Sequence, residues 1–199
     1  MAAEHLRLII VVYTSAIAPL LLMLILRRKK LIPDWVPYVY LASFIACAIG
    51  WELWFTYGWV DGAPVYERRS ATLNTYLPFH VNWLLNSLAD AGTICLGGLL
   101  LLHLSLSNDS NYLTQWRWSA FTLLLIWFIG QNVFVEMYLY HDQLAVGKAL
   151  SWAPFAPTGP WFNPVLFEFN GRTITLQGQL PWLIMTPLFY AGLIRHLRA

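Results

Sequence analysis

Long apolar segments separated by short polar ones run through the whole chain. The first, Leu6–Leu26, is mostly apolar and is followed by the basic block Arg27–Lys30. A helix needs roughly 20 mostly apolar residues to cross a bilayer, and four further stretches meet or approach that length. The pattern predicts an all-α integral membrane protein, a bundle of about five transmembrane helices forming a single domain over 1–199. The expected spans are 6–26, 35–57, 76–104, 118–140 and 180–194, the last being short.

The first segment resembles the apolar part of a signal peptide only superficially. At about 21 residues it exceeds the 7–15 residues usual for that region, so we expect it to be the first span. Trp and Tyr lie at many of the predicted span ends, as is typical of residues at the membrane–water interface.

The distribution of basic residues predicts an orientation. Seven of the twelve Lys and Arg residues fall on one side of the predicted bundle: Arg27, Arg28, Lys29, Lys30, Arg117, Arg195 and Arg198. Cytoplasmic loops carry the excess of Lys and Arg in membrane proteins. We therefore expect the N-terminus outside and the C-terminus in the cytoplasm, in a bacterial inner membrane or a plasma membrane.

One outer segment, residues 141–179, is long and unusual. Its central part, Trp152–Pro164, alternates prolines with aromatic residues, which excludes a regular helix. It is too apolar for a solvated linker, so we expect a lid over the bundle or in the membrane interface. Within it, Val165–Phe169 and Arg172–Leu176 flank Asn170-Gly171, the strongest short-range signal for a β-hairpin. An isolated hairpin is only marginally stable, so this one must pack on something.

Composition supports a membrane protein and excludes several other classes. Hydrophobic residues make up 58% of the chain and charged residues 11%, less than half the share in a typical soluble domain. The net charge of +2, with no basic stripe, argues against nucleic acid as a partner. Cys47 and Cys95 lie inside apolar segments without metal-ligand spacing, and we interpret them as packing residues. No metal ion or other cofactor is predicted.

The third predicted span carries a polar stripe. Asn82, Asn86 and Asp90 are spaced at i, i+4 and i+8, and Thr93 and Gly97 continue this face on an ideal helix. Polar groups inside a bilayer are costly, so this face should point into the bundle.

Further polar residues are expected at a similar depth. Asn132, Glu136 and Tyr140 form a second i, i+4, i+8 series in the fourth span, with Gln131 beside them. Glu52 lies near the outer end of the second span, and His80 lies one turn into the third. In the predicted topology all these groups meet in the outer half of the membrane beneath the lid, whereas the cytoplasmic half is almost entirely apolar.

This clustering favours acid–base chemistry on a hydrophobic small molecule taken from the lipid bilayer. Asp90 or Glu52 would donate a proton to an olefin or epoxide of an isoprenoid-like compound, and Glu136 or His80 would accept one. Indole rings would stabilise an intermediate carbocation. The candidate substrate-binding residues are Asn82, Asn86, Gln131, Asn132, Trp51, Trp54, Trp83 and Tyr140. An isomerase, cyclase (lyase) or hydratase would use such parts.

Two other functions remain open from the sequence. In a non-catalytic subunit of a larger membrane complex, the same amides would only join helices, and the lid would contact other membrane subunits. In a small transporter or proton path, Asp90 and Glu136 would relay protons, but the apolar cytoplasmic half offers no exit.

Overall fold

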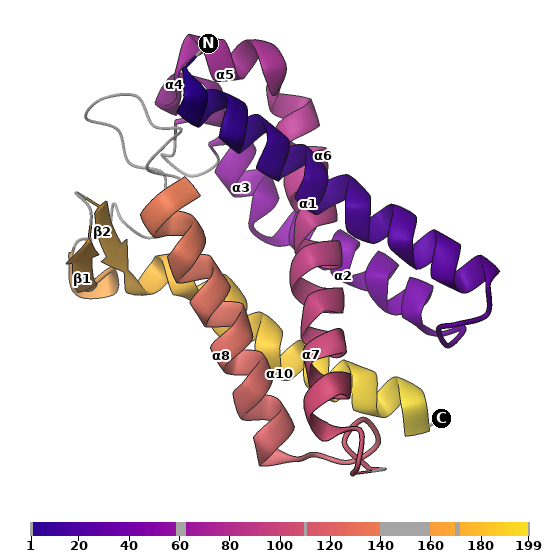
Figure 1. Cartoon of the computed structure of the whole chain (residues 1–199). Helices are drawn as coiled ribbons and strands as arrows, with labels where there is room; N and C mark the ends of the chain where they lie inside the picture. Colours follow the sequence, from indigo (N-terminus) through magenta and orange to yellow (C-terminus); the bar gives the residue numbers. More distant parts are fainter. Residues whose placement is uncertain (1, 59–62, 110, 140–159, 170–171, 199) are drawn as a thin grey trace.

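The computed structural model describes residues 2–58, 63–109, 111–139, 160–169 and 172–198 (Figure 1). This part of the chain is mostly helical and contains one small antiparallel sheet. The longer helices are α1 (Ala3–Arg28), α2 (Val36–Gly50), α6 (Phe79–Ala89), α7 (Gly97–Leu106), α8 (Trp118–Phe134) and α10 (Leu176–Arg198). Shorter elements are α3 (Glu52–Tyr57), α4 (Val65–Arg68), α5 (Ala71–Tyr76), the π-helical segments η1 (Asp90–Leu96) and η2 (Val135–Leu139), and the 3-10 turn η4 (Pro160–Phe162).

Three helices are long and apolar enough to cross a membrane. They are α1, the continuous helix Phe79–Leu106 and the continuous helix Trp118–Leu139. Each agrees closely with an expected span. Much of their apolar surface is exposed, including Leu21 and Leu22 of α1 at 52% and 56%, as a lipid-facing surface requires.

The second and fifth expected spans differ from their predicted bounds. The apolar helix α2 has 15 residues, about 22 Å at 1.5 Å per residue and short of a bilayer's hydrocarbon core of roughly 30 Å. The helix is interrupted at Trp51, between the end of α2 at Gly50 and the start of α3 at Glu52, so the expected span 35–57 is divided near its outer end. In contrast, α10 extends beyond the predicted range 180–194 at both ends.

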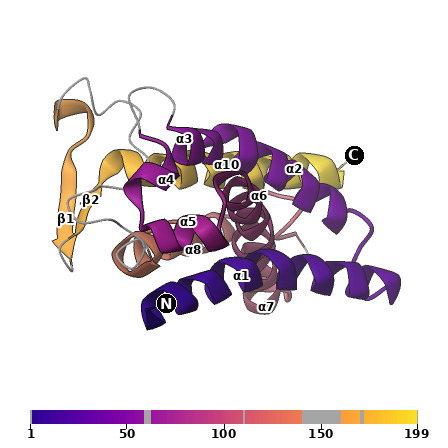
Figure 2. The same ribbon diagram turned by 90° about the horizontal axis from the view of Figure 1, so that it is seen from above.

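The helices form an oblique bundle with α6, α7 and α8 in the middle. Viewed from above, α1 lies on one side of this middle group and α2, α3 and α10 lie on the other (Figure 2). The two chain ends lie at opposite ends of the molecule (Figure 1). The main apolar core joins α7, α8 and α10 around Leu102, Leu124, Phe128 and Tyr190, all fully buried.

Close approach of α7 and α8 depends on Gly98. A Cβ atom at this position would lie 2.9 Å from Leu124 Cδ2 and 3.0 Å from Phe128 Cε1. Small residues at such contacts let membrane helices pack closely, which strengthens dispersion contacts where lipid removes the hydrophobic driving force.

The predicted hairpin is confirmed in its strands. β1 (Val165–Phe169) pairs antiparallel with β2 (Arg172–Thr175), whereas its turn, residues 170–171, lies outside the described residues. The hairpin packs on the end of the helix Trp118–Leu139, where the ring centroids of Phe169 and Tyr138 are 5.7 Å apart. The turn η4, which precedes the hairpin, is tied to the start of α10, because Gln177 Nε2 donates to the Phe162 carbonyl at 2.8 Å. Most of the expected lid, residues 140–159, lies outside the described part of the chain.

Candidate functional site

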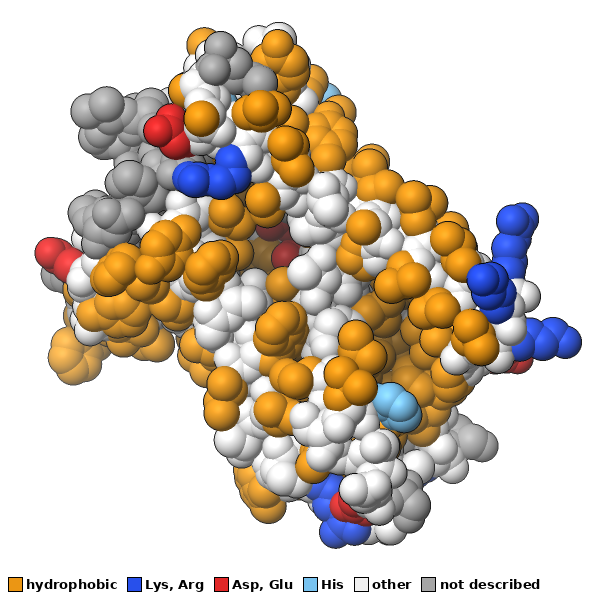
Figure 3. All heavy atoms as spheres, in the orientation of Figure 1, with side chains coloured by type: hydrophobic (Ala, Val, Ile, Leu, Met, Phe, Trp, Pro, Cys, Tyr) orange, Lys and Arg blue, Asp and Glu red, His pale blue; other side chains and the backbone are white. Residues whose placement is uncertain are grey.

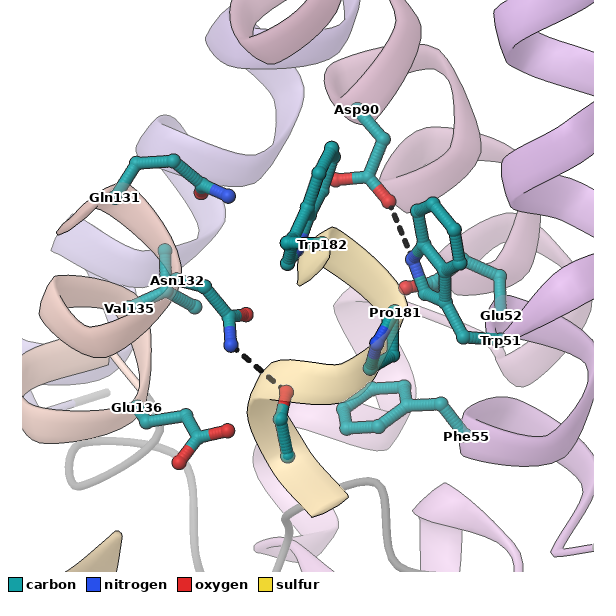
Figure 4. A pocket seen from close by; sticks show the side chains of 11 residues that line it. Trp51, Glu52, Phe55, Asp90, Gln131, Asn132, Val135, Glu136, Pro181 and Trp182 are labelled. Atoms are coloured by element: carbon teal, nitrogen blue, oxygen red, sulfur yellow. Dashed lines mark hydrogen bonds between the residues drawn. The ribbon is translucent and has the colours of Figure 1, made fainter. Parts of the chain in front are cut away.

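A small cavity lies where four segments meet: the junction of α2 and α3, the helix Phe79–Leu106, the helix Trp118–Leu139 and α10 (Figure 4). Its lining residues are Trp51, Glu52, Phe55, Asp90, Gln131, Asn132, Val135, Glu136, Gly178, Pro181 and Trp182. The cavity has a volume of about 60 Å³, measured as the space that the centres of water molecules can occupy. Since a water molecule needs at least 10–15 Å³ on this measure, there is room for about four.

The cavity opens on the face that carries exposed side chains of α1 and α8. In the space-filling view a hollow near the middle of this face shows acidic atoms at its base, framed by hydrophobic and neutral side chains (Figure 3). The charged residues visible at the surface lie mainly at the edges of the molecule (Figure 3). The acidic groups are therefore surrounded by surface suited to lipid.

Two carboxyl groups on one side of the cavity accept hydrogen bonds from neutral donors. The indole N–H of Trp51 donates to Asp90 Oδ2 at 2.8 Å. The amide of Asn86 donates to Glu52 Oε2 at 3.1 Å, and Glu52 is buried. Figure 4 shows the Asp90 carboxyl group beside the Trp51 ring, with Glu52 on the same side of the cavity. A neutral N–H group can donate to a carboxyl group in either its charged or its protonated form, which suits groups that exchange protons.

Local helix geometry brings these residues together. The interruption at Trp51 turns two consecutive residues, Trp51 and Glu52, toward the third helix. Asp90 is the first residue of η1, where the continuous helix Phe79–Leu106 changes from α to π hydrogen bonding. Single π-helical turns often occur at functional sites, since they change which residues face the interior.

The opposite wall of the cavity comes from the helix Trp118–Leu139, which joins α8 and η2. Asn132 Nδ2 donates to the carbonyl of Gly178 and to Gln179 Oε1, both at 2.9 Å. The Glu136 side chain, 2% exposed, lies in the second π-helical segment and contacts the start of α10. A Cβ atom on Gly178 would lie 2.5 Å from Glu136 Oε1, so glycine is required for this carboxyl position. The N-terminal end of a helix carries partial positive charge, which favours a negatively charged neighbour.

Aromatic rings complete the cavity between the two walls. The rings of Trp182 and Trp51 have centroids 4.9 Å apart, and those of Trp182 and Phe128 are 5.1 Å apart. In Figure 4, Trp182 lies between Asp90 on one side and Gln131 and Asn132 on the other. The site thus combines carboxyl groups with the faces and edges of indole rings.

Several of the residues expected at one site are found beside the cavity rather than in it. Asn86 acts through Glu52, as described above. Asn82 is buried, but its Oδ1 accepts from Arg69 Nη1 at 2.9 Å. Arg69 also donates to Asn74 Oδ1 at 2.7 Å and to the Leu77 carbonyl. Burial lowers the pKa of Arg69 to about 10, so its guanidinium group stays charged at neutral pH and supports the polar end of the third helix.

Other expected residues point elsewhere. His80 is exposed and shares a hydrogen bond of 2.8 Å with the Tyr57 hydroxyl. Trp83 donates to the Ala48 carbonyl at 2.9 Å, and the ring of Trp54 lies 5.8 Å from the Arg68 guanidinium carbon. None of these three lines the cavity. Tyr140 lies outside the described residues.

The expected continuation of the polar stripe through Thr93 and Gly97 is wrong. Thr93 Oγ1 donates to the Ser15 carbonyl of α1 at 2.7 Å, and Gly97 faces the Trp127 ring of α8. A π-helical turn holds more residues than an α-helical turn, so the face beyond Asp90 rotates away from the cavity.

The last helix contributes cavity residues that the sequence did not indicate. Gly178, Pro181 and Trp182 belong to α10, and Phe55 and Val135 are apolar neighbours of expected polar residues. One sequence signal pointed to this end of α10: Gln177 and Gln179 stand at the start of an apolar segment. The structure buries both side chains.

The cavity-lining set contains three acidic side chains and no Lys, Arg or His among the described residues. Within that part of the chain, no three His, Cys, Asp or Glu side chains gather closely enough to hold a metal ion. Glu136 lies across the cavity from the Asp90 and Glu52 pair (Figure 4).

No family model, curated protein or solved structure matches the chain.

Proposed function

We propose that this protein is a multi-pass membrane protein with five spans, an outer N-terminus and a cytoplasmic C-terminus. The opposite positions of the two chain ends support an odd number of spans (Figure 1). In this arrangement α2 with α3 forms the second span, and α10 forms the fifth. The cavity then lies in the outer half of the membrane.

Within that topology, we propose an intramembrane enzyme that moves protons to and from a lipidic, isoprenoid-like substrate. The observation that carries this proposal is the placement of Asp90, Glu52 and Glu136 around one cavity lined by Trp51 and Trp182. An ionised carboxyl group inside a bilayer is expensive, and such residues mark functional sites by default. Ligand sites typically combine apolar and aromatic walls with a few polar groups.

The proposed chemistry divides the carboxyl groups between the two walls. Asp90 or Glu52 donates a proton to one carbon of an olefin, and the adjacent carbon becomes a carbocation. The rings of Trp51 and Trp182 stabilise that positive charge through cation–π interaction. Glu136, against the first turn of α10, accepts a proton from a neighbouring carbon, and a new double bond forms. The substrate is isomerised without net change in its atoms, and exchange with solvent restores both carboxyl groups.

The size of the cavity limits how the substrate sits. Space for about four water molecules accommodates a reacting end, not a whole isoprenoid. The rest of the substrate would lie along the apolar surface around the opening, still within the bilayer.

Deuterium incorporation tests the proposal even though the substrate is not identified. Membranes containing the protein are incubated in D₂O, and their extracted lipids are compared by mass spectrometry with lipids from membranes lacking it. We expect a lipid species that gains carbon-bound deuterium only when the protein is present. Asp90→Asn should abolish this signal, whereas Glu67→Gln, which alters an exposed acidic residue on α4, should retain it. Absence of protein-dependent labelling, or equal loss in both variants, would overturn the proposal.

A second function, a non-catalytic subunit of a membrane complex, is favoured by the hairpin and the turn η4 that precedes it. Trp161 is 87% exposed, and Phe162, Val165 and Leu166 are exposed as well. An exposed apolar surface of this kind suits a protein partner or the membrane interface. Chemical cross-linking from a cysteine placed at Leu166, followed by mass spectrometry, separates the two: a single cross-linked membrane protein would support the subunit role.

A further inference from the structure

A second concave surface lies at the far end of α10, away from the carboxyl-lined cavity. This basic cleft is lined by Trp116, Ala191, Ile194, Arg195 and Arg198 and has a volume of about 360 Å³. It is wider than the acidic cavity and opens to the surface. Its lining joins two guanidinium groups to an indole ring and two apolar side chains.

The loop that carries Trp116 is held firmly against α10. The Tyr190 hydroxyl shares its proton with the carbonyls of Tyr112 (2.8 Å) and Gln115 (3.1 Å) and accepts from the Arg117 N–H at 3.1 Å. The Trp116 and Tyr190 rings are also in contact, with centroids 5.0 Å apart. These bonds hold one wall of the cleft, so its shape is built into the fold.

Among the described residues, no acidic side chain pairs with the two arginines of the basic cleft. Arg117 is paired with Asp109 at 3.0 Å, just outside the cleft. Arg195 and Arg198 are exposed, and neither forms an ion pair within the described part of the chain. Arg198 Nε donates to the Thr114 carbonyl, which orients its guanidinium group without neutralising it.

Aromatic side chains indicate the depth of the cleft in a membrane. Trp116 contacts the rings of Trp118 and Phe121 at 5.7 and 5.1 Å, and Trp118 is 71% exposed at the start of α8. Exposed Trp side chains at the end of a membrane helix mark the level of the lipid headgroups. The cleft therefore offers positive charge at headgroup level and an apolar floor, Ala191 and Ile194, on its membrane side.

We propose that this basic cleft binds an anionic phospholipid, with the headgroup phosphate on Arg195 and Arg198. Arginine donates several hydrogen bonds in a planar arrangement suited to phosphate. The first part of an acyl chain would then lie over Ala191 and Ile194, beside the Trp116 ring. Basic pockets between membrane helices recognise lipid headgroups in this way.

Native mass spectrometry of the detergent-solubilised protein tests this site. Binding is measured for phosphatidylglycerol and phosphatidylcholine with identical acyl chains. We expect the intact protein to bind phosphatidylglycerol more tightly. The double variant Arg195→Gln/Arg198→Gln should weaken that binding about 30-fold, at roughly fivefold for each charge lost near a membrane surface. The control Arg28→Gln/Lys29→Gln removes the same charge from the exposed end of α1, outside the cleft, and should weaken binding much less than the cleft variant does.

A steric variant addresses the apolar floor without altering charge. Ala191 is exposed on the cleft surface, so Ala191→Phe should fill the floor, weaken binding of both lipids and leave the melting temperature unchanged. Equal binding of the two lipids by the intact protein would overturn the proposal, as would an equal effect of the control double variant. Complete displacement by soluble glycerol phosphate would identify a free phosphate ester as the ligand and would also overturn it.

Discussion

Gly178→Ala tests the position of the Glu136 carboxyl group directly. The added Cβ would lie 2.5 Å from Glu136 Oε1, about 1 Å closer than the optimal separation of non-bonded heavy atoms. Either the carboxyl group or the start of α10 must move. Glu136 is buried, so displacing its carboxyl group disturbs the surroundings that accommodate it, at a cost of about 1.5–3 kcal/mol for a charged group.

The higher helix propensity of alanine offsets part of this loss, and a matched control variant measures that gain in stability. Replacing Gly by Ala inside a helix gains about 1 kcal/mol. Gly192 lies on the same helix, and a Cβ atom there would have no neighbour within 4 Å, so Gly192→Ala should show the gain alone. For Gly178→Ala we expect a net destabilisation of about 0.5–2 kcal/mol, the difference between the two effects.

The assay is thermal unfolding of each variant in the same detergent, with Glu136→Ala as a second background. Once the carboxyl group is removed, Gly178→Ala should stabilise the protein as much as Gly192→Ala does. The coupling between the two positions is then about 1.5–3 kcal/mol. Identical behaviour of the two alanine variants in the original background would refute the close contact between Glu136 and Gly178.

Three further predictions concern stability and packing. Asn86→Leu should cost about 1–3 kcal/mol in unfolding free energy, because Glu52 loses its amide donor; an unchanged melting temperature would contradict that hydrogen bond. Tyr190→Phe should lower stability by a similar amount, about 1–3 kcal/mol, and speed proteolysis of the loop at residues 111–117; if cleavage rates match, the hydroxyl does not hold the loop. Gly98→Ala should destabilise by about 1–3 kcal/mol through overpacking against Leu124, and a rise in melting temperature would argue against close contact of α7 and α8.

The polar stripe on the third helix shows how far periodicity alone could predict the site. The i, i+4, i+8 spacing correctly indicated that Asn82, Asn86 and Asp90 face the interior of the bundle. It could not indicate that each has a different partner, since the partners come from segments distant in sequence. It was wrong for Thr93 because the π-helical turn is decided by packing against other helices and leaves no periodic signal.

His80 and Trp182 illustrate the opposite errors. His80 had a chemically suitable side chain at a suitable depth, but rotation about the helix axis leaves it exposed and bonded to Tyr57. Trp182 appeared only as an apolar residue in a short expected span, but the path of α10 brings it into the cavity. Depth along a membrane axis can be estimated from sequence, whereas the facing direction of a residue near a helix end depends on how the helices cross.

By itself, the sequence determined the helical character of the chain, three segments suited to crossing a membrane and the strands of the hairpin. These features depend on local composition and spacing, because backbone hydrogen bonds in an apolar medium must be satisfied within a segment. Only the tertiary structure decided the interruption at Trp51, the two π-helical turns and the contribution of α10 to the cavity. Each of these arises where side chains from distant segments compete for the same space, which no local pattern records.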